Sequence, residues 1–355
     1  MNYIGSKYSL LQFLDECISE VTKGSEENKV FCDLFSGTAN VGKYFKKKGF
    51  QIIANDLQYY SYVLCKQYID NHKPLLFNNI KEELSITEDE NIKDKVCSYL
   101  DTIDGVEGFV YNNFCKGKHT ENEEYRLYFS DENGAKCDAI RQKIEHWHKE
   151  RKITNNEYYF LLATLIENID KVANTASVYG AFLKKIKSSA QKTLTMKPAE
   201  MIYNDKEHFV YNEDANKLIR KIKTDILYLD PPYNQRQYSA NYHVLETIAK
   251  YDNPLLKGKT GMRDYSQQKS DYCNKRKVKE VFNDLIMNAN AKYIFLSYNN
   301  EGLMSFEEIK QIMSKRGKYG CFSKQYNRFK ADKESETRHI KTNITTEYLH
   351  YVICE

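Results

Sequence analysis

The sequence predicts an α/β fold with a doubly wound, mostly parallel sheet. In the first 70 residues, short apolar segments alternate with amphipathic ones, which is the pattern of strands and helices in β-α-β order. Further strand-like segments return after residue 203, and three predicted strands end in the acids Asp33, Asp56 and Asp230. Parallel strands place such residues at one edge of the sheet, where α/β proteins bind ligands.

The elements of the first half follow from local periodicity. Leu10, Leu11, Leu14 and Ile18 recur at helical spacing in the first helix, and Gly49 marks the end of the second. The predicted order is helix 7–21, strand 29–35, helix 38–49, strand 50–57 and helix 60–72.

The middle of the chain reads differently. An acidic stretch over 80–95 precedes a region, 96–200, that we expect to be mostly helical, with clear helices over 139–153 and 156–175. Strand signals then return over 208–214, 225–230, 291–298 and 346–354. We therefore expect one α/β domain built from both ends of the chain, with a helical insertion in its middle.

Composition narrows the class of protein. With 355 residues, 41% of them hydrophobic and a net charge of +4, the chain fits a folded globular protein for which a polyanion is a compatible partner. Nine scattered cysteines without a C-x-x-C pair indicate reduced thiols of a cytoplasmic protein rather than a disulfide framework or a zinc site. His146 and His148 point apart on a helix, so we expect no metal, and no apolar run is long enough for a membrane.

The stretch "DLFSGTANVG", residues 33–42, predicts a nucleoside-bearing cofactor. A strand runs into a turn of small residues, Gly37, Thr38 and Ala39, and then into a helix. Asp56, at the end of the next strand, is placed to accept hydrogen bonds from ribose hydroxyls. A plain tight turn with a surface acid is the alternative, and the spacing to Gly42 also leaves a nicotinamide oxidoreductase open.

The stretch "LDPPYNQRQY", residues 229–238, suits an amino group on a planar ring. Pro231 and Pro232 have no N–H, so the segment offers only acceptors, and Tyr233 adds a flat aromatic face. The carboxylate of Asp230 and the carbonyl of Pro231 can hold the two N–H bonds of an exocyclic amine. This releases the lone pair of the nitrogen from the ring, so that it can attack an electrophile.

The N-terminal "MNYIGSK" is a weaker signal. Tyr3 and Lys7 flank a tight turn and are candidates to bind a carboxylate-bearing cofactor, while Ser6 as the N-cap of the first helix is an equal alternative.

Together these motifs resemble the amino-methylating DNA methyltransferases, specifically the adenine-N6 group called the D12 or alpha class, of restriction-modification or Dam-like type. The order is the same: Lys7, then Asp33-Leu-Phe35-Ser-Gly37, a helical insertion, and Asp230-Pro-Pro-Tyr233, followed by "NYHVLET". Ala39 departs from the family, where many members have a second glycine.

The resemblance implies S-adenosylmethionine as cofactor and assigns roles to residues. Phe35 is expected near the cofactor's adenine, Asp33 and Gly37 at its methionine end, Asp56 at its ribose and Asp214 near the adenine ring, with helix N-capping as the other role of Asp214. The full expected cofactor set is Tyr3, Lys7, Asp33, Phe35, Ser36, Gly37, Thr38, Asp56, Leu57, Asp214, Ala215 and Asp230, and the catalytic set is Asp230, Pro231, Pro232 and Tyr233.

The resemblance also implies that residues 1–75 and 203–355 form the catalytic domain, and 76–202 a target-recognition insertion. Double-stranded DNA is the expected partner, with the target adenine flipped out of the duplex. The expected DNA contacts are Arg236, Tyr238, Tyr326, Arg328, Phe329, Lys330, Lys184 and Lys185, with the basic stretch 257–279 as a further candidate for phosphate.

The sequence thus predicts a site-specific DNA adenine-N6 methyltransferase that transfers the methyl group directly, as the modification enzyme of a bacterial restriction-modification system with a possible cognate endonuclease. Three alternatives stay open: an amino methyltransferase acting on cytosine N4, RNA adenine or a glutamine amide; a nicotinamide oxidoreductase; and a DNA-binding module without catalysis.

Overall fold

The computed structural model describes residues 5–24, 29–87, 91–120, 124–327 and 344–355, which form two compact units. The sheet unit comprises Ile4–Cys65, Asn204–Tyr238 and Ser266–Glu355, and the helical unit comprises Lys66–Tyr203 and Ser239–Tyr265. The expected insertion, 76–202, lies inside the helical unit. Residues 239–265, which we had placed with the catalytic domain, pack with the helical unit instead.

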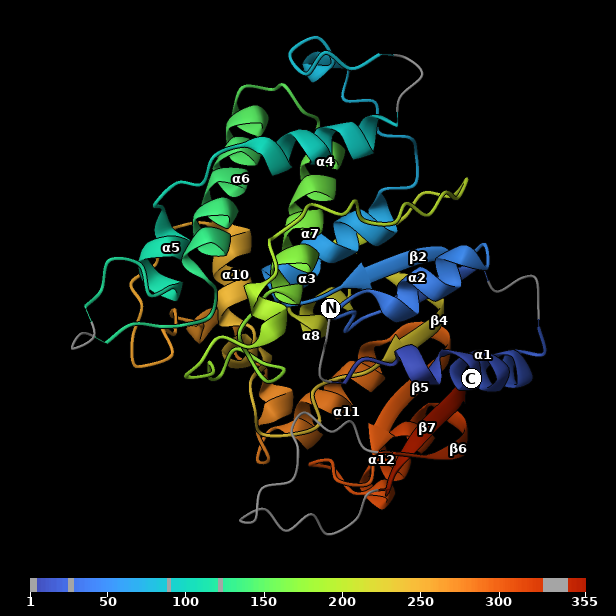
Figure 1. The fold of residues 1–355 in the computed structure, drawn as a ribbon. Coiled ribbons are helices and arrows are strands. Elements are labelled where there is room, and N and C mark those ends of the chain that lie inside the picture. The colour runs from blue at the N-terminus through green and yellow to red at the C-terminus, as the bar shows by residue number, and fades with distance from the viewer. Residues whose placement is uncertain (1–4, 25–28, 88–90, 121–123, 328–343) are drawn as a thin grey trace. The chain divides into compact units, whose positions relative to one another are not determined.

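The sheet unit is built on a seven-stranded sheet in the order β3-β2-β1-β4-β5-β7-β6 (Figure 1). The first five of these strands are parallel, and β7 runs antiparallel to both β5 and β6. The predicted doubly wound, mostly parallel sheet is confirmed. Its strands are β1 (Val30–Asp33), β2 (Gln51–Asn55), β3 (Phe209–Tyr211), β4 (Lys223–Leu229), β5 (Asn290–Asn299), β6 (Gly317–Asn327) and β7 (Ile344–Cys354).

The direction of strand order reverses between β1 and β4. Asp33 pairs with Tyr228 in the parallel register, so the chain leaves β1 and β4 side by side at the carboxyl edge. Such a switch point is where open α/β sheets bind their ligands.

Helices cover both faces of the sheet, which explains why its central strands are apolar along their length. Side chains alternate along β1: Phe31 stacks on Phe45 of α2 with ring centroids 4.1 Å apart, while Cys32 joins the core formed with α8, α11 and α12. The helices of this unit are α1 (Leu11–Thr22), α2 (Asn40–Lys47), α3 (Tyr59–Cys65), α8 (Ala215–Leu218), α11 (Val278–Asn288) and α12 (Phe306–Met313).

The outermost strand, β6, was not among the strands predicted from the sequence. Its sequence, "GKYGCFSKQYN", holds two glycines and two lysines and lacks a clear apolar alternation. An edge strand has a neighbour on one side only and tolerates such residues, so its pairing with β7 decides its conformation.

The helical unit contains α4 (Ile92–Thr102), α5 (Phe109–Phe114), α6 (Asp131–Lys149), α7 (Asn155–Lys171) and α10 (His243–Lys250), with a π-helical turn at Lys66–Asp70. The short α9 (Tyr238–Asn241) spans the junction between the two units in sequence. A capping box of Thr154 and Glu157 starts α7. The region 96–200 was expected to be mostly helical, which is wrong for its last part: the described residues 172–200 contain one 3-10 turn, Ser188–Gln191, and no α-helix.

Arg141 explains why residues 239–265 join the helical unit. This buried arginine of α6 donates hydrogen bonds to the carbonyls of Ile248 and Ala249, at 3.1 and 3.2 Å, and forms an ion pair with Glu145. The guanidinium thereby satisfies carbonyl groups at the end of α10 that the helix itself leaves unpaired.

All nine cysteines are free thiols. His146 and His148 have separate neighbours: His146 lies 3.6 Å from Glu150, and His148 Nε2 lies 2.8 Å from the side-chain oxygen of Asn155. Among the described residues, the helices are too short or too polar to cross a membrane.

Candidate active site

The turn after β1 is held by its own hydrogen bonds. The Ser36 hydroxyl donates to the Asp33 carbonyl at 2.6 Å, and the Ala39 N–H donates to the Ser36 carbonyl at 2.8 Å. Gly37 and Ala39 adopt left-handed conformations, with φ of +51° and +61°. Glycine suits this region best, so the turn is shaped for small residues and Ala39 holds a strained backbone.

Two carboxylates lie on either side of this turn. The Asp33 carboxylate accepts the Gly42 N–H at 3.0 Å, at the start of α2. The Asp56 carboxylate accepts the Gly37 N–H with one oxygen and the Gln58 N–H with the other, both at 2.8 Å. Asp56, which was predicted to accept hydrogen bonds from a ribose, therefore also contacts the turn directly.

Asn55, which was not among the residues predicted from the sequence, links the loops at this edge. Its amide nitrogen donates to the carbonyls of Leu34 and Glu213, at 3.2 and 3.1 Å, and its amide oxygen accepts the Glu213 N–H at 3.0 Å. The side chain is buried and links the segments that follow β1, β2 and β3. A buried asparagine at the end of an apolar strand was the available signal.

An aromatic pair lies beside the turn. Phe35 is half-buried and meets Tyr272 edge to face, with ring centroids 5.1 Å apart, and the Tyr272 hydroxyl donates to Asn216 of α8 at 2.8 Å. Asp214, the residue before α8, caps that helix by accepting the Lys217 N–H at 3.1 Å. The N-capping role proposed for Asp214 is confirmed, and its carboxylate stays exposed. Ala215 is buried behind it.

Leu57 and Gln58 lie under a neighbouring loop. The Leu57 carbonyl accepts a long hydrogen bond of 3.4 Å from the Gln268 side chain. The side-chain oxygen of Gln58 is buried and has no hydrogen-bond partner among the residues that the structure describes.

The end of β4 carries a buried cluster of three charges. Lys7 Nζ lies 3.0 Å from Asp230 Oδ1 and 3.1 Å from Glu347 Oε1 of β7. The side chains of Lys7 and Glu347 are 4% and 0% exposed, and that of Asp230 is 16% exposed. We had expected Lys7 to meet a cofactor carboxylate; in the structure it binds two carboxylates of the protein. Glu347 did not figure among the predicted residues.

The residues after Asp230 are anchored to the same unit. The Tyr233 carbonyl accepts the Leu303 N–H at 3.0 Å, and its ring meets Tyr298 edge to face at 6.0 Å. Lys7 Nζ lies 5.6 Å from the centre of the Tyr233 ring. Pro231 is buried, while Pro232 and Tyr233 remain half-buried at this edge.

The N-terminal loop closes on this region. Gly5 has φ of +81°, and a Cβ there would lie 2.9 Å from the Tyr238 hydroxyl, so only glycine fits. Asn40 donates to the hydroxyls of Ser6 and Thr38, both at 3.0 Å, and thus joins this loop to the turn after β1. Ser6 is not the N-cap of α1, which is Leu10; instead the Ser6 hydroxyl accepts the Tyr8 N–H at 3.4 Å, at the start of the 3-10 turn Tyr8–Leu10 that precedes α1.

Burial alters the acid–base properties of these carboxyl groups. Burial raises the pKa of Asp33 to about 7, against the Gly42 hydrogen bond and with the help of nearby Asp230 and Asp56. Burial also raises the pKa of Asp230 to about 6, opposed by Lys7 and reinforced by Glu347. Burial acts to lower the pKa of Lys7, but Asp230 and Glu347 together hold it well above its usual value. Such shifts mark functional sites more often than structural ones.

The expected DNA-binding residues lie in several places. Arg236 is exposed on the loop after Tyr233, and Lys184 and Lys185 are exposed in the helical unit. Arg263 is buried and forms two hydrogen bonds with Asp252, at 2.9 and 2.7 Å, so it is not available to a phosphate. Tyr3, Arg328, Phe329 and Lys330 fall outside the described residues, as does the side chain of Tyr326 at the end of β6.

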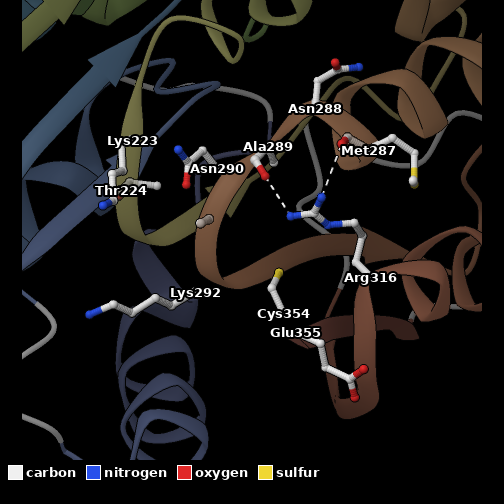
Figure 2. A pocket seen from close by; sticks show the side chains of 11 residues that line it. Lys223, Thr224, Met287, Asn288, Ala289, Asn290, Lys292, Arg316, Cys354 and Glu355 are labelled. Atoms are coloured by element: carbon white, nitrogen blue, oxygen red, sulfur yellow. Dashed lines mark hydrogen bonds between the residues drawn. The ribbon is translucent and has the colours of Figure 1, made fainter.

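A hollow at the opposite edge of the sheet has a different character. Figure 2 shows this cavity of about 550 Å³ at the amino ends of β4 and β5. Arg316 lines this cavity, and its guanidinium donates hydrogen bonds to the carbonyls of Met287 and Ala289, at 3.2 and 2.8 Å. Lys292 forms an ion pair with Asp225 at 3.0 Å. Arg316 binds carbonyls at the end of α11 and Lys292 binds the start of β4, and among the residues that the structure describes no buried carboxylate cluster lines this hollow.

Comparison with known proteins shows which family this chain is similar to. Residues 3–312 match the model of a family described as D12 class N6 adenine-specific DNA methyltransferase. The chain is 51% identical over 350 residues to the Type II methyltransferase M.NlaIII of Neisseria lactamica, covering 99% of this chain and 98% of that protein.

Two further relatives show the same relationship. The Type II methyltransferase M.CviAII of Paramecium bursaria Chlorella virus 1 is 34% identical over 355 residues, covering 100% of this chain and 99% of that protein. The Type II methyltransferase M.FokI of Planomicrobium okeanokoites is 39% identical over 360 residues, covering 99% of this chain and 52% of that protein. A match of this extent decides against a nicotinamide oxidoreductase and against transfer to cytosine or RNA, and it confirms the predicted activity. The chain belongs to the D12 class of N6 adenine-specific DNA methyltransferases.

Proposed function

We propose that this adenine methyltransferase uses S-adenosylmethionine and acts on an adenine flipped out of duplex DNA, by direct transfer without a covalent enzyme intermediate. One observation carries the proposal: Asp230, at the end of β4, is held by Lys7 at the same sheet edge as the turn between Asp33 and Asp56. This places an acceptor for an amine beside a turn that suits a nucleoside-bearing ligand.

The residues of the edge fit the proposed cofactor. Asp33 and Asp230 bring negative charge that favours a cationic ligand, and the raised pKa of Asp33, to about 7, reflects burial without a full counter-charge. The buried oxygen of Gln58, beside Asp56, has no hydrogen-bond partner among the described residues, and a donor on a ligand would satisfy it. Phe35 offers a half-buried ring for a base.

In this proposal the cofactor set named above holds the ligand: Asp56 and Leu57 at the ribose, Asp214 and Phe35 at the base, and Asp33 with Gly37 at the amino-acid end. When bound, S-adenosylmethionine supplies an electrophilic methyl group on a positively charged sulfur. All other chemistry belongs to the chain's own residues.

Asp230 and Pro231 prepare the amine. The Asp230 carboxylate and the Pro231 carbonyl accept hydrogen bonds from the two N–H groups of N6, and this directs the lone pair of N6 away from the ring. Pro231 and Pro232 have no N–H that could compete for these acceptors. Tyr233, fixed by Leu303 and Tyr298, stacks on the base. The amine becomes acidic only after alkylation, so Asp230 need not remove a proton before attack.

We propose that the helical unit contributes to DNA binding. It holds a cavity of about 330 Å³ lined in part by the cations Arg126, Lys184 and Lys259 and by the rings of Phe182 and Tyr125. Arg126 donates to the carbonyl of Gly258 at 3.1 Å, so its position is fixed. Cations beside aromatic rings suit a phosphate with a neighbouring unstacked base. Lys185, Arg236 and Tyr238, together with Tyr326, Arg328, Phe329 and Lys330, remain the other proposed DNA contacts.

A role in restriction-modification follows from the relatives, whose names describe Type II methyltransferases and modification methylases. We propose that this chain modifies the site of a cognate restriction endonuclease. Long-read sequencing of DNA from cells that express the chain gives the methylated adenines and their flanking bases.

The central experiment is incubation with tritiated S-adenosylmethionine and mixed-sequence duplex DNA, followed by nucleoside digestion. We expect label in N6-methyladenine. Binding of the cofactor without incorporation, or label in another nucleoside, contradicts the proposal.

A second experiment addresses the helical unit. Lys184→Gln is expected to weaken DNA binding about three- to tenfold and to reduce the salt slope of binding by about 1. Lys149→Gln is the matched control, since Lys149 is an exposed lysine of the same unit paired with Glu145. Equal affinities and slopes for both variants and wild type rule out a phosphate contact by Lys184.

A further inference from the structure

We infer that Gln237 is a positioning residue that couples the catalytic loop, residues 230–237, to the cofactor site through a neighbouring segment of the chain. This segment, residues 266–273, contains two 3-10 turns, and we name it the bridging segment. The inference rests on the proposed function, because it takes the cofactor to bind beside Asp56 and the target adenine beside Asp230.

Gln237 pairs with the bridging segment as one peptide group pairs with another in a sheet. Its side-chain oxygen accepts the Ser270 N–H at 2.8 Å, and its side-chain nitrogen donates to the Ser270 carbonyl at 3.1 Å. The Cys273 thiol adds a weaker hydrogen bond of 3.4 Å to the Arg236 carbonyl. Because two bonds join Gln237 to the same residue, they fix both the distance and the orientation of the loop against the segment.

The catalytic loop needs such support at its end. Residues 231–237 belong to neither a helix nor a strand, so no regular backbone pairing holds them. Tyr233 is anchored by the Leu303 N–H, whereas the residues after it are held by side-chain hydrogen bonds, such as that from the Arg236 N–H to Asn234 at 2.9 Å. Loops held in this way open more easily than helices or strands.

The bridging segment also contacts the loop after β2, where the ribose is proposed to bind. The Gln58 side-chain nitrogen donates to the Gln268 carbonyl, and the Gln268 side-chain nitrogen donates to the Leu57 carbonyl, both at 3.4 Å. The buried side-chain oxygen of Gln58 has no hydrogen-bond partner among the described residues. A donor on the cofactor that binds this oxygen therefore restrains a side chain that already contacts the bridging segment.

Tyr272 extends these contacts to the residues proposed to bind the base. Its ring meets Phe35 edge to face with centroids 5.1 Å apart, and its hydroxyl donates to Asn216 at 2.8 Å. Asn216 lies on α8, which begins directly after Asp214. The Tyr272 side chain is 5% exposed, so its packed neighbours limit its movement. A cofactor held by Phe35 and Asp214 thus also restrains the bridging segment.

The two halves of the active site therefore share one support. Cofactor binding orders the bridging segment, and Gln237 passes this order to the loop that receives the adenine. By linkage, the cofactor tightens DNA binding and DNA tightens cofactor binding by the same factor. A loop that is placed less accurately slows methyl transfer even when both ligands are bound, because the reacting groups must be aligned.

The experiment compares wild type, Gln237→Met and Gln51→Met. Methionine has nearly the length of glutamine and forms neither hydrogen bond with Ser270. Gln51 is the matched control, because its side chain donates to the Glu207 carbonyl at 2.9 Å at the amino end of β2. The dissociation constant of duplex DNA is measured with and without S-adenosylhomocysteine, which lacks the transferable methyl group. The single-turnover rate is measured with S-adenosylmethionine at saturating DNA.

We expect S-adenosylhomocysteine to tighten DNA binding about fivefold or more in wild type and in Gln51→Met. In Gln237→Met this factor should fall below about twofold, and the single-turnover rate should fall about 10- to 100-fold. The affinity of Gln237→Met for S-adenosylhomocysteine without DNA should stay within about threefold of wild type. Three results overturn the inference: an unchanged factor in Gln237→Met, the same loss in Gln51→Met, or no coupling in wild type.

Hydrogen exchange tests the path of the coupling without DNA. In wild type, S-adenosylhomocysteine should slow amide exchange in residues 266–273 and in residues 234–237. In Gln237→Met, only residues 266–273 should gain protection. Protection of residues 234–237 that survives this substitution means that the ligand acts on the loop directly, and it overturns the inference. Should Gln237→Met fail to fold, Gln237→Ala decides by the same measurements, since it also removes both hydrogen bonds.

Asp230→Asn separates this inference from the proposed function. If wild type does not bind S-adenosylhomocysteine, or if Asp230→Asn transfers methyl groups at the wild-type rate, the proposed function fails and the inference fails with it. If wild type binds S-adenosylhomocysteine, Asp230→Asn is inactive and Gln237→Met behaves as wild type, only the inference fails.

Discussion

Asp225 and Asp230 belong to the same stretch of chain, one near the start of β4 and the other just past its end, yet their environments are opposite. Asp225 accepts the N–H groups of Lys29 and Val30, both at 2.9 Å, and pairs with Lys292. Burial acts to raise the pKa of Asp225, but these three donors together hold it below its usual value.

Asp230 has fewer donors and a second carboxylate nearby, so its pKa rises to about 6. The hydrogen bonds of Asp225 are filled by the protein, whereas we propose that Asp230 is kept for the substrate. On this proposal the two edges of the sheet differ in role, one structural and one functional.

The largest effect is expected from Asp230→Asn. The amide cannot hold the amine as a carboxylate does, so we expect single-turnover methylation to fall by about 10³-fold while the cofactor still binds. Asp225→Asn, the matched change at the other edge, should keep transfer near the wild-type rate and lose about 1–3 kcal/mol of unfolding free energy. Similar rates for the two variants would break the comparison.

Asp33 allows a test through stability. Its folded-state pKa, about 7, lies above the usual value of 3.8, so its contribution to stability is full below pH 4 and is lost as pH rises through 7. Relative to Asp33→Asn, the wild type should lose about 4 kcal/mol of unfolding free energy between these limits. Urea denaturation from pH 4 to 8.5 measures this difference.

For Asp225→Asn, the difference in stability from the wild type should depend on pH in the opposite direction. The lowered pKa of Asp225 gives stability that is present at neutral pH and lost in acid, so the wild type should lose its advantage over this variant as pH falls. Parallel pH profiles for Asp33→Asn and Asp225→Asn would show that the edges do not differ as described.

The rate of methylation should depend on the ionisation of Asp230. In the proposed mechanism the Asp230 carboxylate accepts one N–H of the amine and the Pro231 carbonyl accepts the other. Protonation of Asp230 weakens it as an acceptor, and burial raises its pKa to about 6. We expect the single-turnover rate of the wild type to fall tenfold for each pH unit below about 6 and to level off above it. A rate that stays constant down to pH 5 contradicts an ionised Asp230.

The smallest effect concerns the backbone of the same edge. Ala39 has φ of +61° in the turn after β1, so Ala39→Gly should raise the unfolding free energy by about 0.5–1 kcal/mol. Ala54→Gly is the control, because Ala54 lies buried in β2 and glycine there should destabilise by a similar amount. Destabilisation by Ala39→Gly would show that the turn is not strained.

Much of the fold could be predicted because it depends on local pattern. The strands that end at Asp33 and Asp56, and the helices α6 and α7, follow apolar periodicity and capping residues that are adjacent in sequence. The edge strand β6 could not be read in this way, because its pairing with β7 compensates for a sequence of low strand propensity. The assignment of residues 239–265 to the helical unit likewise depends on contacts of Arg141 with a distant segment.

The candidate site shows the same division. Proline and glycine positions and strand-end acids are visible in the sequence, and the structure places Asp33, Asp56 and Asp230 at one edge. Asn55 and Glu347 were not predicted because each lies within a strand and its partners come from segments far away in the sequence. The partner of Glu347, Lys7, is 340 residues away in the chain.

The sequence by itself determined which chemical groups this protein carries and in what order, since a strand end, a proline pair or a tight turn is defined by neighbours along the chain. The tertiary structure alone decided their charge state. Lys7, Asp230 and Glu347 act on one another only because the fold brings Lys7 to 3.0 and 3.1 Å from the two carboxylates in a buried site. Burial and Coulomb interaction depend on distances in space rather than along the chain. The pKa of Asp230 in "LDPPYNQRQY" is therefore raised only in the folded protein.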